Sequence, residues 1–255
     1  MNAELVTSMW AIGLGALAGW LSCVLVVWLP QNILNEEAQW LAEIQGTEWQ
    51  ATQPHGLRAC AAHAMAQRGR CLLWVLGGVA LALALKGGMG ASWRTALWGV
   101  WLWALLTSAA IDKDTQLLPD ALTQPLLWLG LLIQTVQSLS TIGLENALWG
   151  AVMGYMILWV MDQLYKRWRG ISGVGQGDMK LLAAVGAWLG PQATSNVLLI
   201  AALASLLSQG FMRLMKPQST PVEFAFGPWL AIAGWLVMLW GEGLLPAFQR
   251  LLTGG

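Results

Sequence analysis

Two aspartates at the edges of apolar segments, Asp112 and Asp178, are the side chains best placed to do chemistry. A carboxylate at the lip of a membrane helix is costly, so it is by default a candidate functional group. Asp178 follows three alternating glycines, Gly173, Gly175 and Gly177. Glycines in this position let the backbone bend sharply or let another chain approach closely. We therefore expect Gly175 and Gly177 to allow a substrate strand to lie against the backbone beside Asp178.

Two carboxyl groups that share one proton can hydrolyse a peptide without a covalent intermediate. The ionised group takes a proton from water, while the protonated group donates a hydrogen bond to the carbonyl oxygen of the peptide. Asp178 could instead cap the helix that it precedes. Lys180 could influence Asp178 and the approach of substrate, although a lysine extending to the membrane interface is the commoner case. We expect Asp114 and Asp120 to be dispensable, as a loop residue and a first-turn charge.

Composition predicts the class of protein that holds these groups. The chain has 255 residues, of which 57% are hydrophobic and only 10% are charged, and it contains 18 tryptophans. A soluble domain carries about a quarter charged residues, and tryptophan gathers at membrane interfaces. The formal net charge is zero, which gives no argument for nucleic acid as a partner. No Lys or Arg precedes Arg58, so we expect the first apolar segment to stay as a membrane span rather than to be a cleaved signal.

The apolar segments predict an all-α, polytopic bundle of about eight spans. Because a span needs about 20 mostly apolar residues, the second and sixth segments are short. With the N-terminus in the periplasm, most Lys and Arg residues fall inside, and Asp112 and Asp178 reach the same cytoplasmic side. We expect a first span over 1–30, a cytoplasmic loop domain over 31–70 and a peptidase core over 71–255. The segments are 6–30, 71–85, 95–111, 119–139, 146–165, 179–189, 196–215 and 226–246.

Three motifs make the chain resemble the type IV prepilin peptidase family, which belongs to the GxGD-type intramembrane aspartyl proteases. The first runs from Ile111 and Asp112 to Pro119 and Asp120, in the order Ile-Asp-Lys-Asp-Thr-Gln-Leu-Leu-Pro-Asp. The second is Gly-Gln-Gly-Asp-Met-Lys-Leu over residues 175–181, and the third is Phe-Gly-Pro-Trp-Leu-Ala over residues 226–231. The resemblance implies that Asp112 and Asp178 are the catalytic pair.

The resemblance also implies an environment and partners. Members of this family are enzymes of the bacterial inner membrane with eight spans and an external N-terminus. They cut the leader from type IV prepilins or type II secretion pseudopilins at the cytoplasmic face, just after a glycine. The implied partners are these substrates, the lipid bilayer and the pilus or type II secretion assembly machinery. Many members also methylate the new N-terminus using S-adenosylmethionine, while the peptidase step itself requires no cofactor.

The polar loop departs from the family pattern. Members usually carry two Cys-x-x-Cys pairs that bind zinc, but here Trp74 stands where the partner of Cys71 should be. His55, Cys60, His63 and Cys71 could be assembled into a set of four ligands, yet their spacing matches no standard zinc pattern. We therefore expect no zinc, and S-adenosylmethionine only if the methyltransferase activity is retained.

Two other functional classes are compatible with paired carboxylates in a membrane protein. In a proton-coupled transporter, aspartates relay protons, but such proteins usually show repeated halves and broken helices near the midplane. The third possibility is an inactive scaffold in a pilus or secretion assembly. The intact motifs around Asp112 and Asp178 favour the peptidase over both.

Overall fold

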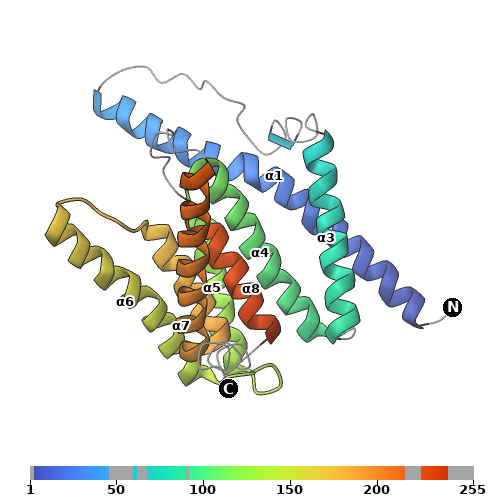
Figure 1. Ribbon diagram of the computed structural model, residues 1–255. Helices are drawn as coiled ribbons and strands as arrows, with labels where there is room; N and C mark the ends of the chain where they lie inside the picture. The colour runs from blue at the N-terminus through green and yellow to red at the C-terminus, as the bar shows by residue number, and fades with distance from the viewer. Residues whose placement is uncertain (1–2, 46–59, 62–67, 90–91, 216–224, 241–255) are drawn as a thin grey trace. The chain divides into compact units, whose positions relative to one another are not determined.

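The computed structural model describes residues 3–45, 60–61, 68–89, 92–215 and 225–240 (Figure 1). Every long element in these residues is a helix, and none is a strand, which confirms the prediction of an all-α protein. The chain divides into two compact units, Met1–Ile111 and Asp112–Gly255. The long helices within the described residues are α1 (Ala3–Gln45), α3 (Arg68–Met89), α4 (Trp93–Thr115), α5 (Asp120–Thr135), α6 (Leu144–Arg169), α7 (Gln176–Met215) and α8 (Gly227–Trp240).

Each predicted apolar segment falls mainly on a helix as far as the structure describes it, but several boundaries differ. The segment 119–139, for example, extends beyond α5, which ends at Thr135. We expected the first segment to end at Pro30, whereas α1 continues through this proline to Gln45. The residues that follow Pro30 are rich in Leu, Glu, Gln and Ala, which favour helix. The segments 179–189 and 196–215 both lie in α7, on either side of a break at Gly190 (φ 83°, ψ 174°). Glycine adopts this backbone readily, and Pro191 can then start the next helical part.

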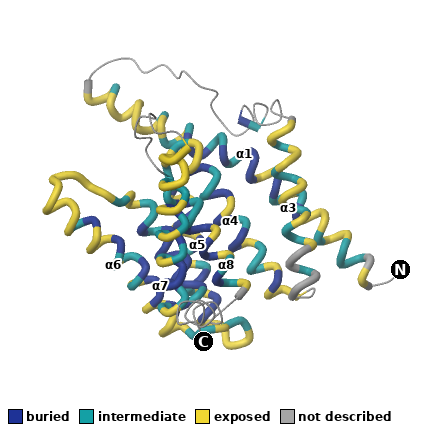
Figure 2. Tube along the Cα trace, in the orientation of Figure 1, coloured by how far each residue is buried: buried dark blue, intermediate teal, exposed yellow. Residues whose placement is uncertain are grey.

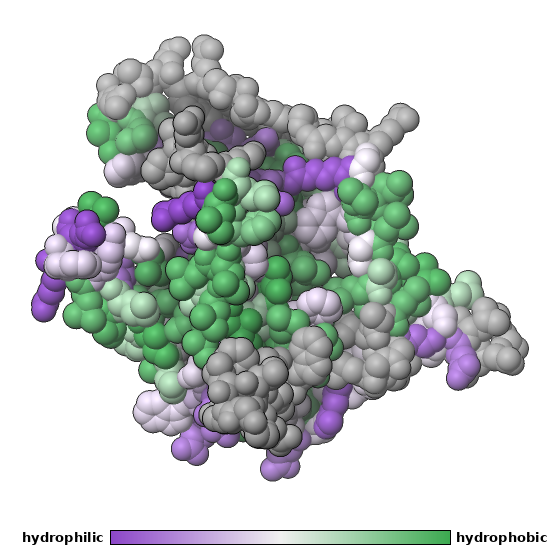
Figure 3. Space-filling view, in the orientation of Figure 1, coloured by the Kyte–Doolittle hydropathy of each residue, from purple (hydrophilic) through white to green (hydrophobic). Residues whose placement is uncertain are grey.

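The outer faces of the helices match a lipid environment. Among the described residues, four helices are long and apolar enough to cross a membrane, judged by length and composition: Val6–Ile44, Trp93–Thr115, Leu144–Arg169 and Gln176–Met215. Large apolar side chains project from them, including Leu207 and Leu214, which are 74% and 82% exposed. Figure 3 shows a mostly hydrophobic surface over the described helices, with hydrophilic residues near their ends. The chain is therefore a helical membrane protein.

Helix α7 is the centre of the second unit, where it packs against α6, α8 and α5. Nearly all of its first part, from Met179 to Trp188, is buried (Figure 2). A helix that is apolar on every side must be surrounded by other elements or by lipid. α6 and α7 approach closely, because a methyl group added at Gly154 would lie 2.6 Å from the carbonyl oxygen of Leu182. The glycines of α6 therefore serve close helix packing.

The close packing of α6 and α7 predicts that a methyl group at Gly186 is destabilising. In Gly186→Ala, the new methyl group would collide with the carbonyl oxygen of Gly150, so α6 and α7 would have to separate. We expect the free energy of unfolding in detergent to fall by about 1–3 kcal/mol, as for other overpacked sites. Gly210→Ala is the matched control on the same helix, since no atom lies within 4 Å of its added methyl group. Equal stability of the two variants would contradict the close contact.

In the first unit, too, helix backbones approach closely at glycines. A methyl group added at Gly15 would lie 2.5 Å from the carbonyl oxygen of Gly78, so α1 and α3 meet backbone to backbone. Ser22 and Thr107 share a buried hydrogen bond of 2.9 Å between α1 and α4. These contacts hold the first unit together, while all the residues of the predicted catalytic motifs except Ile111 belong to the second.

Candidate active site

Asp112 lies in the last turn of α4 and is 5% exposed. Its Oδ2 accepts a hydrogen bond of 2.8 Å from the backbone N–H of Gly227. Gly227 is the first residue of α8, so the positive end of that helix dipole faces the carboxylate. A methyl group added at Gly227 would lie 2.7 Å from Oδ2 of Asp112, so the absence of a side chain is what permits this approach.

Asp178 lies in the first turn of α7 and is half-buried. Its Oδ1 is buried and has no hydrogen-bond partner among the described residues. A buried carboxylate oxygen without a donor is costly, and in native proteins such a group calls for an explanation such as a catalytic role. The charges of Asp178 and Asp112 interact electrostatically. The two predicted catalytic aspartates, both in the second unit, therefore lie within electrostatic range of each other.

The two glycines predicted to admit substrate lie in different surroundings. Gly175 is exposed, and its carbonyl oxygen accepts the N–H of Asp178 at 3.1 Å, which starts the first turn of α7. A methyl group at Gly177 would lie 2.5 Å from Cβ of Leu118 in the connection between α4 and α5. Gly177 is thus required for packing beside the site, while Gly175 leaves its backbone open on the surface.

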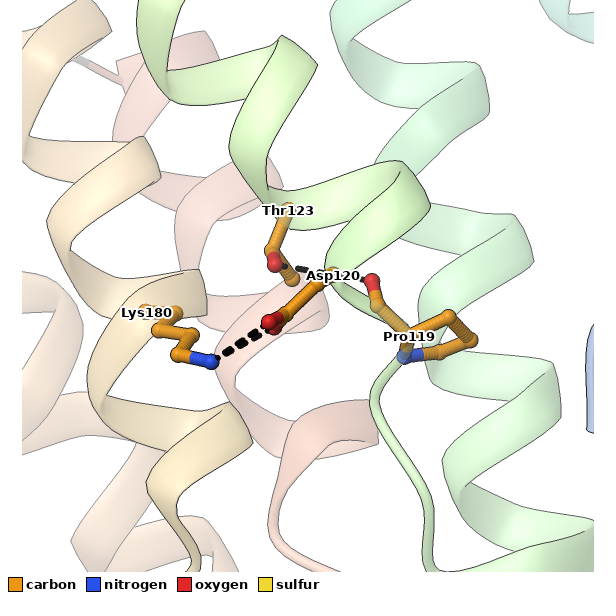
Figure 4. A network of polar contacts seen from close by, with 4 residues as sticks. All are labelled: Pro119, Asp120, Thr123 and Lys180. Carbon is orange, nitrogen blue, oxygen red and sulfur yellow. Dashed lines mark hydrogen bonds and ion pairs between the residues drawn. The ribbon is translucent and has the colours of Figure 1, made fainter. Parts of the chain in front are cut away.

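Lys180 forms an ion pair with Asp120 rather than with a catalytic aspartate (Figure 4). Its Nζ donates to both carboxylate oxygens of Asp120, at 2.7 and 2.8 Å. Asp120 lies in the first turn of α5 next to Pro119, so this pair joins α5 to the start of α7. The Asp120 side chain is 58% exposed, and exposed pairs contribute only about 0–1 kcal/mol to stability.

Sequence reasoning missed Asp162, a buried carboxylate on α6 that binds the glycine-rich loop before α7. Its Oδ1 accepts hydrogen bonds from the Ser172 hydroxyl at 2.6 Å and from the N–H groups of Gly173 and Val174 at 2.9 and 3.2 Å. The signal was present in the sequence, since a carboxylate within an apolar helix is expected to have a specific partner. The partners of Asp162 could not be identified from the sequence, because two of the three donors are backbone N–H groups.

The predicted metal ligands are only partly described. His55 and His63 lie outside the described residues. Cys60 is buried, and its thiol donates to Oε1 of Gln31 at 3.3 Å. Cys71 packs against a cluster that contains the buried Cys23. In the part of the chain that the structure describes, no group of three or more His, Cys, Asp or Glu residues could hold a metal ion.

Comparison with known proteins finds a similarity to a known family over most of the residues of this site. Residues 99–208 match the model of the type IV leader peptidase family. Over these residues the chain is similar to that family. Asp112 and Asp178, together with Asp162 and the glycine-rich loop, all lie within the part that matches the type IV leader peptidases, whereas Gly227 lies beyond it.

Relatives named prepilin leader peptidase/N-methyltransferase share this part. The protein from Stutzerimonas stutzeri is 44% identical over 163 residues, which cover 63% of this chain and 55% of the relative. The protein from Pseudomonas aeruginosa is 43% identical over 179 residues, covering 68% and 60%, and that from Pectobacterium carotovorum is 46% identical over 141 residues, covering 54% and 50%. The chain thus spans about half to 60% of the length of these relatives. No solved structure matches it.

Proposed function

We propose that the protein is a membrane aspartyl endopeptidase that removes the leader peptide of type IV prepilins or type II secretion pseudopilins. The observation that supports the proposal is the electrostatic interaction between Asp112 and Asp178, together with one buried oxygen of Asp178 that has no hydrogen-bond donor among the described residues. Two interacting carboxyl groups of this kind suit water activation and peptide hydrolysis. The family of residues 99–208 and the names of the relatives support the same reaction.

The surroundings of the two aspartates suggest a division of labour. Asp112 receives an N–H donor at a helix N-terminus, which stabilises a negative charge, so we assign it the ionised state. Asp112 then takes a proton from the attacking water. Asp178 carries the shared proton and donates a hydrogen bond to the oxygen of the scissile carbonyl. When the tetrahedral intermediate collapses, Asp112 passes its proton to the leaving amine, which balances the hydrolysis.

The proposal includes a location. We place the protein in the bacterial inner membrane, with about eight spans, a periplasmic N-terminus and a site that opens to the cytoplasm. The segments are a first span over 1–30, a cytoplasmic part over 31–70 and the peptidase core over 71–255. The bias of Lys and Arg toward one side supports this orientation. The partners would be prepilins or pseudopilins, the bilayer and the pilus or type II secretion machinery, without nucleic acid.

The test is leader removal in a host that lacks its own prepilin peptidase. The protein is expressed together with a prepilin, and the prepilin is followed on a gel and by the mass of its N-terminal peptide. We expect the shortened form, with a new terminus just after a glycine. If only the full-length precursor is found while the protein is present in the membrane fraction, with all tested prepilins and pseudopilins, the proposed function is wrong.

A second prediction concerns methylation. The resemblance implies zinc-binding cysteine pairs in methylating members, but Trp74 replaces the cysteine that would pair with Cys71. We therefore expect the new N-terminus produced by this protein alone to carry no methyl group. The mass of the N-terminal peptide from the same coexpression decides this. A methylated terminus, obtained in a host without another prepilin methyltransferase, would contradict the prediction.

A further inference from the structure

A buried carboxylate on α6, Asp162, binds the loop between α6 and α7. Asp162 is 6% exposed, and its Oδ1 alone accepts the three hydrogen bonds from Ser172, Gly173 and Val174. Bonds to an ionised acceptor are about twice as strong as bonds between neutral groups. The positive charge of Lys166, one helical turn along α6, supports the negative charge of Asp162.

The packing of the loop follows from this attachment. α6 ends at Arg169, and the next residue, Gly170, adopts a left-handed backbone (φ 77°) that turns the chain back along the helix. A methyl group at Gly173 would lie 2.6 Å from the ring of Tyr165, so the loop lies flat on the last turns of α6. Asp162 and Tyr165 hold residues 172–174 on one side of the helix.

The attached segment ends four residues before Asp178. Directly after Val174, the carbonyl oxygen of Gly175 accepts the N–H groups of Asp178 and Met179, at 3.1 and 3.4 Å. These bonds form the first turn of α7, which carries the Asp178 side chain. The position of that turn therefore depends on where residues 172–174 are held.

We propose that Asp162 is a positioning residue for Asp178: it fixes the glycine-rich loop on α6 and thereby sets the first turn of α7. The inference rests on the proposed function, since it assigns Asp162 a role in the same reaction. Asp162 does not touch the reacting atoms. Its loss is expected to lower the rate of the chemical step while leaving the affinity for the prepilin nearly unchanged, because a small displacement of a reacting group is costly.

The test compares four variants of the full-length protein in detergent. Asp162→Ala removes the acceptor, and we expect kcat for leader removal to fall about 100-fold, with KM changed by less than about threefold. Asp162→Asn keeps an acceptor oxygen without the charge, and Ser172→Ala removes one of the three donors. We expect kcat for leader removal to fall about tenfold in each. Glu145→Ala removes an exposed carboxylate at the other end of α6 and should leave kcat and KM for leader removal unchanged.

Hydrogen exchange separates this inference from the proposed function. In Asp162→Ala, the N–H groups of Gly173 and Val174 should exchange at least about tenfold faster than in the parent, while those in the middle of α6 should not. Unchanged exchange would overturn the inference, and so would faster exchange with an unchanged kcat. If the parent protein cleaves no prepilin, the proposed function fails, and exchange alone then decides whether Asp162 holds the loop. If Asp162→Ala does not fold, Asp162→Asn and Ser172→Ala are judged by the same two measurements.

Discussion

Asp178→Asn and Asp112→Asn should each abolish leader removal in the coexpression assay. Asparagine has nearly the shape of aspartate, but it can neither take a proton from water nor share one with its neighbour. Positioned acid or base catalysis contributes about 10²–10⁴-fold to a rate. We therefore expect the cleavage rate of either variant to be at least about 10²-fold below that of the parent. Since both groups act in the same chemical step, the double variant should be little worse than either single variant.

The control for this result is Asp120→Asn. Asp120 lies on α5, the helix that follows Asp112 in the chain, but its side chain is largely exposed and is paired with Lys180. Its replacement should therefore lower the free energy of unfolding by less than about 1 kcal/mol and leave the cleavage rate almost unchanged. Amounts of protein in the membrane fraction must match the parent for all three variants. Normal processing by either Asp112→Asn or Asp178→Asn would show that the pair is not the catalytic machinery.

Gly227→Ala should lower the rate of cleavage by about 100-fold, although residue 227 contributes no side chain to the reaction. The added methyl group would lie 2.7 Å from Oδ2 of Asp112, inside the van der Waals contact distance, so either the carboxylate or the start of α8 must move. Movement in either direction breaks the hydrogen bond from the Gly227 N–H that stabilises the charge of Asp112. The expected consequence is a loss in kcat rather than in affinity for the prepilin.

Gly210→Ala is the matched control, since it makes the same change on α7 with no atom within 4 Å of the new methyl group. We expect it to cleave at the rate of the parent. If Gly227→Ala also cleaves at that rate, the contact between α8 and Asp112 is not part of the working site, and the assignment of the ionised state to Asp112 loses its support.

The fold class could be predicted, and the two aspartates could be singled out as candidates, because each leaves a local signal in the sequence. Runs of about 20 apolar residues predict membrane helices, and Asp112 and Asp178 interrupt or border such runs. The ends of helices were harder to predict. Pro30 looked like a boundary, yet α1 passes through it, because surrounding residues that favour helix outweigh one missing N–H donor.

The groups around the aspartates could not be predicted, because they act through the backbone. The N–H of Gly227 reaches Asp112 from 115 residues away, and no pattern of side chains marks that approach. Asp162 likewise binds two backbone N–H groups and one hydroxyl in a loop that the sequence marks only as rich in glycine. For Lys180 the sequence left two roles open, and neither included the ion pair with Asp120.

The central claim is that the side chains at positions 112 and 178 meet, and a chemical cross-link measures this most directly. Asp112→Cys and Asp178→Cys are combined in a protein whose Cys23, Cys60 and Cys71 are replaced by alanine, and a short reagent with two thiol-reactive groups is added to membranes. Mass spectrometry of the digested protein should find the peptides of residues 112 and 178 joined in high yield. A control pair of Asp112→Cys with Gly210→Cys should not be joined. If each single cysteine reacts with a monofunctional reagent but the pair at 112 and 178 is never linked, the two carboxylates do not share a site and the account is wrong.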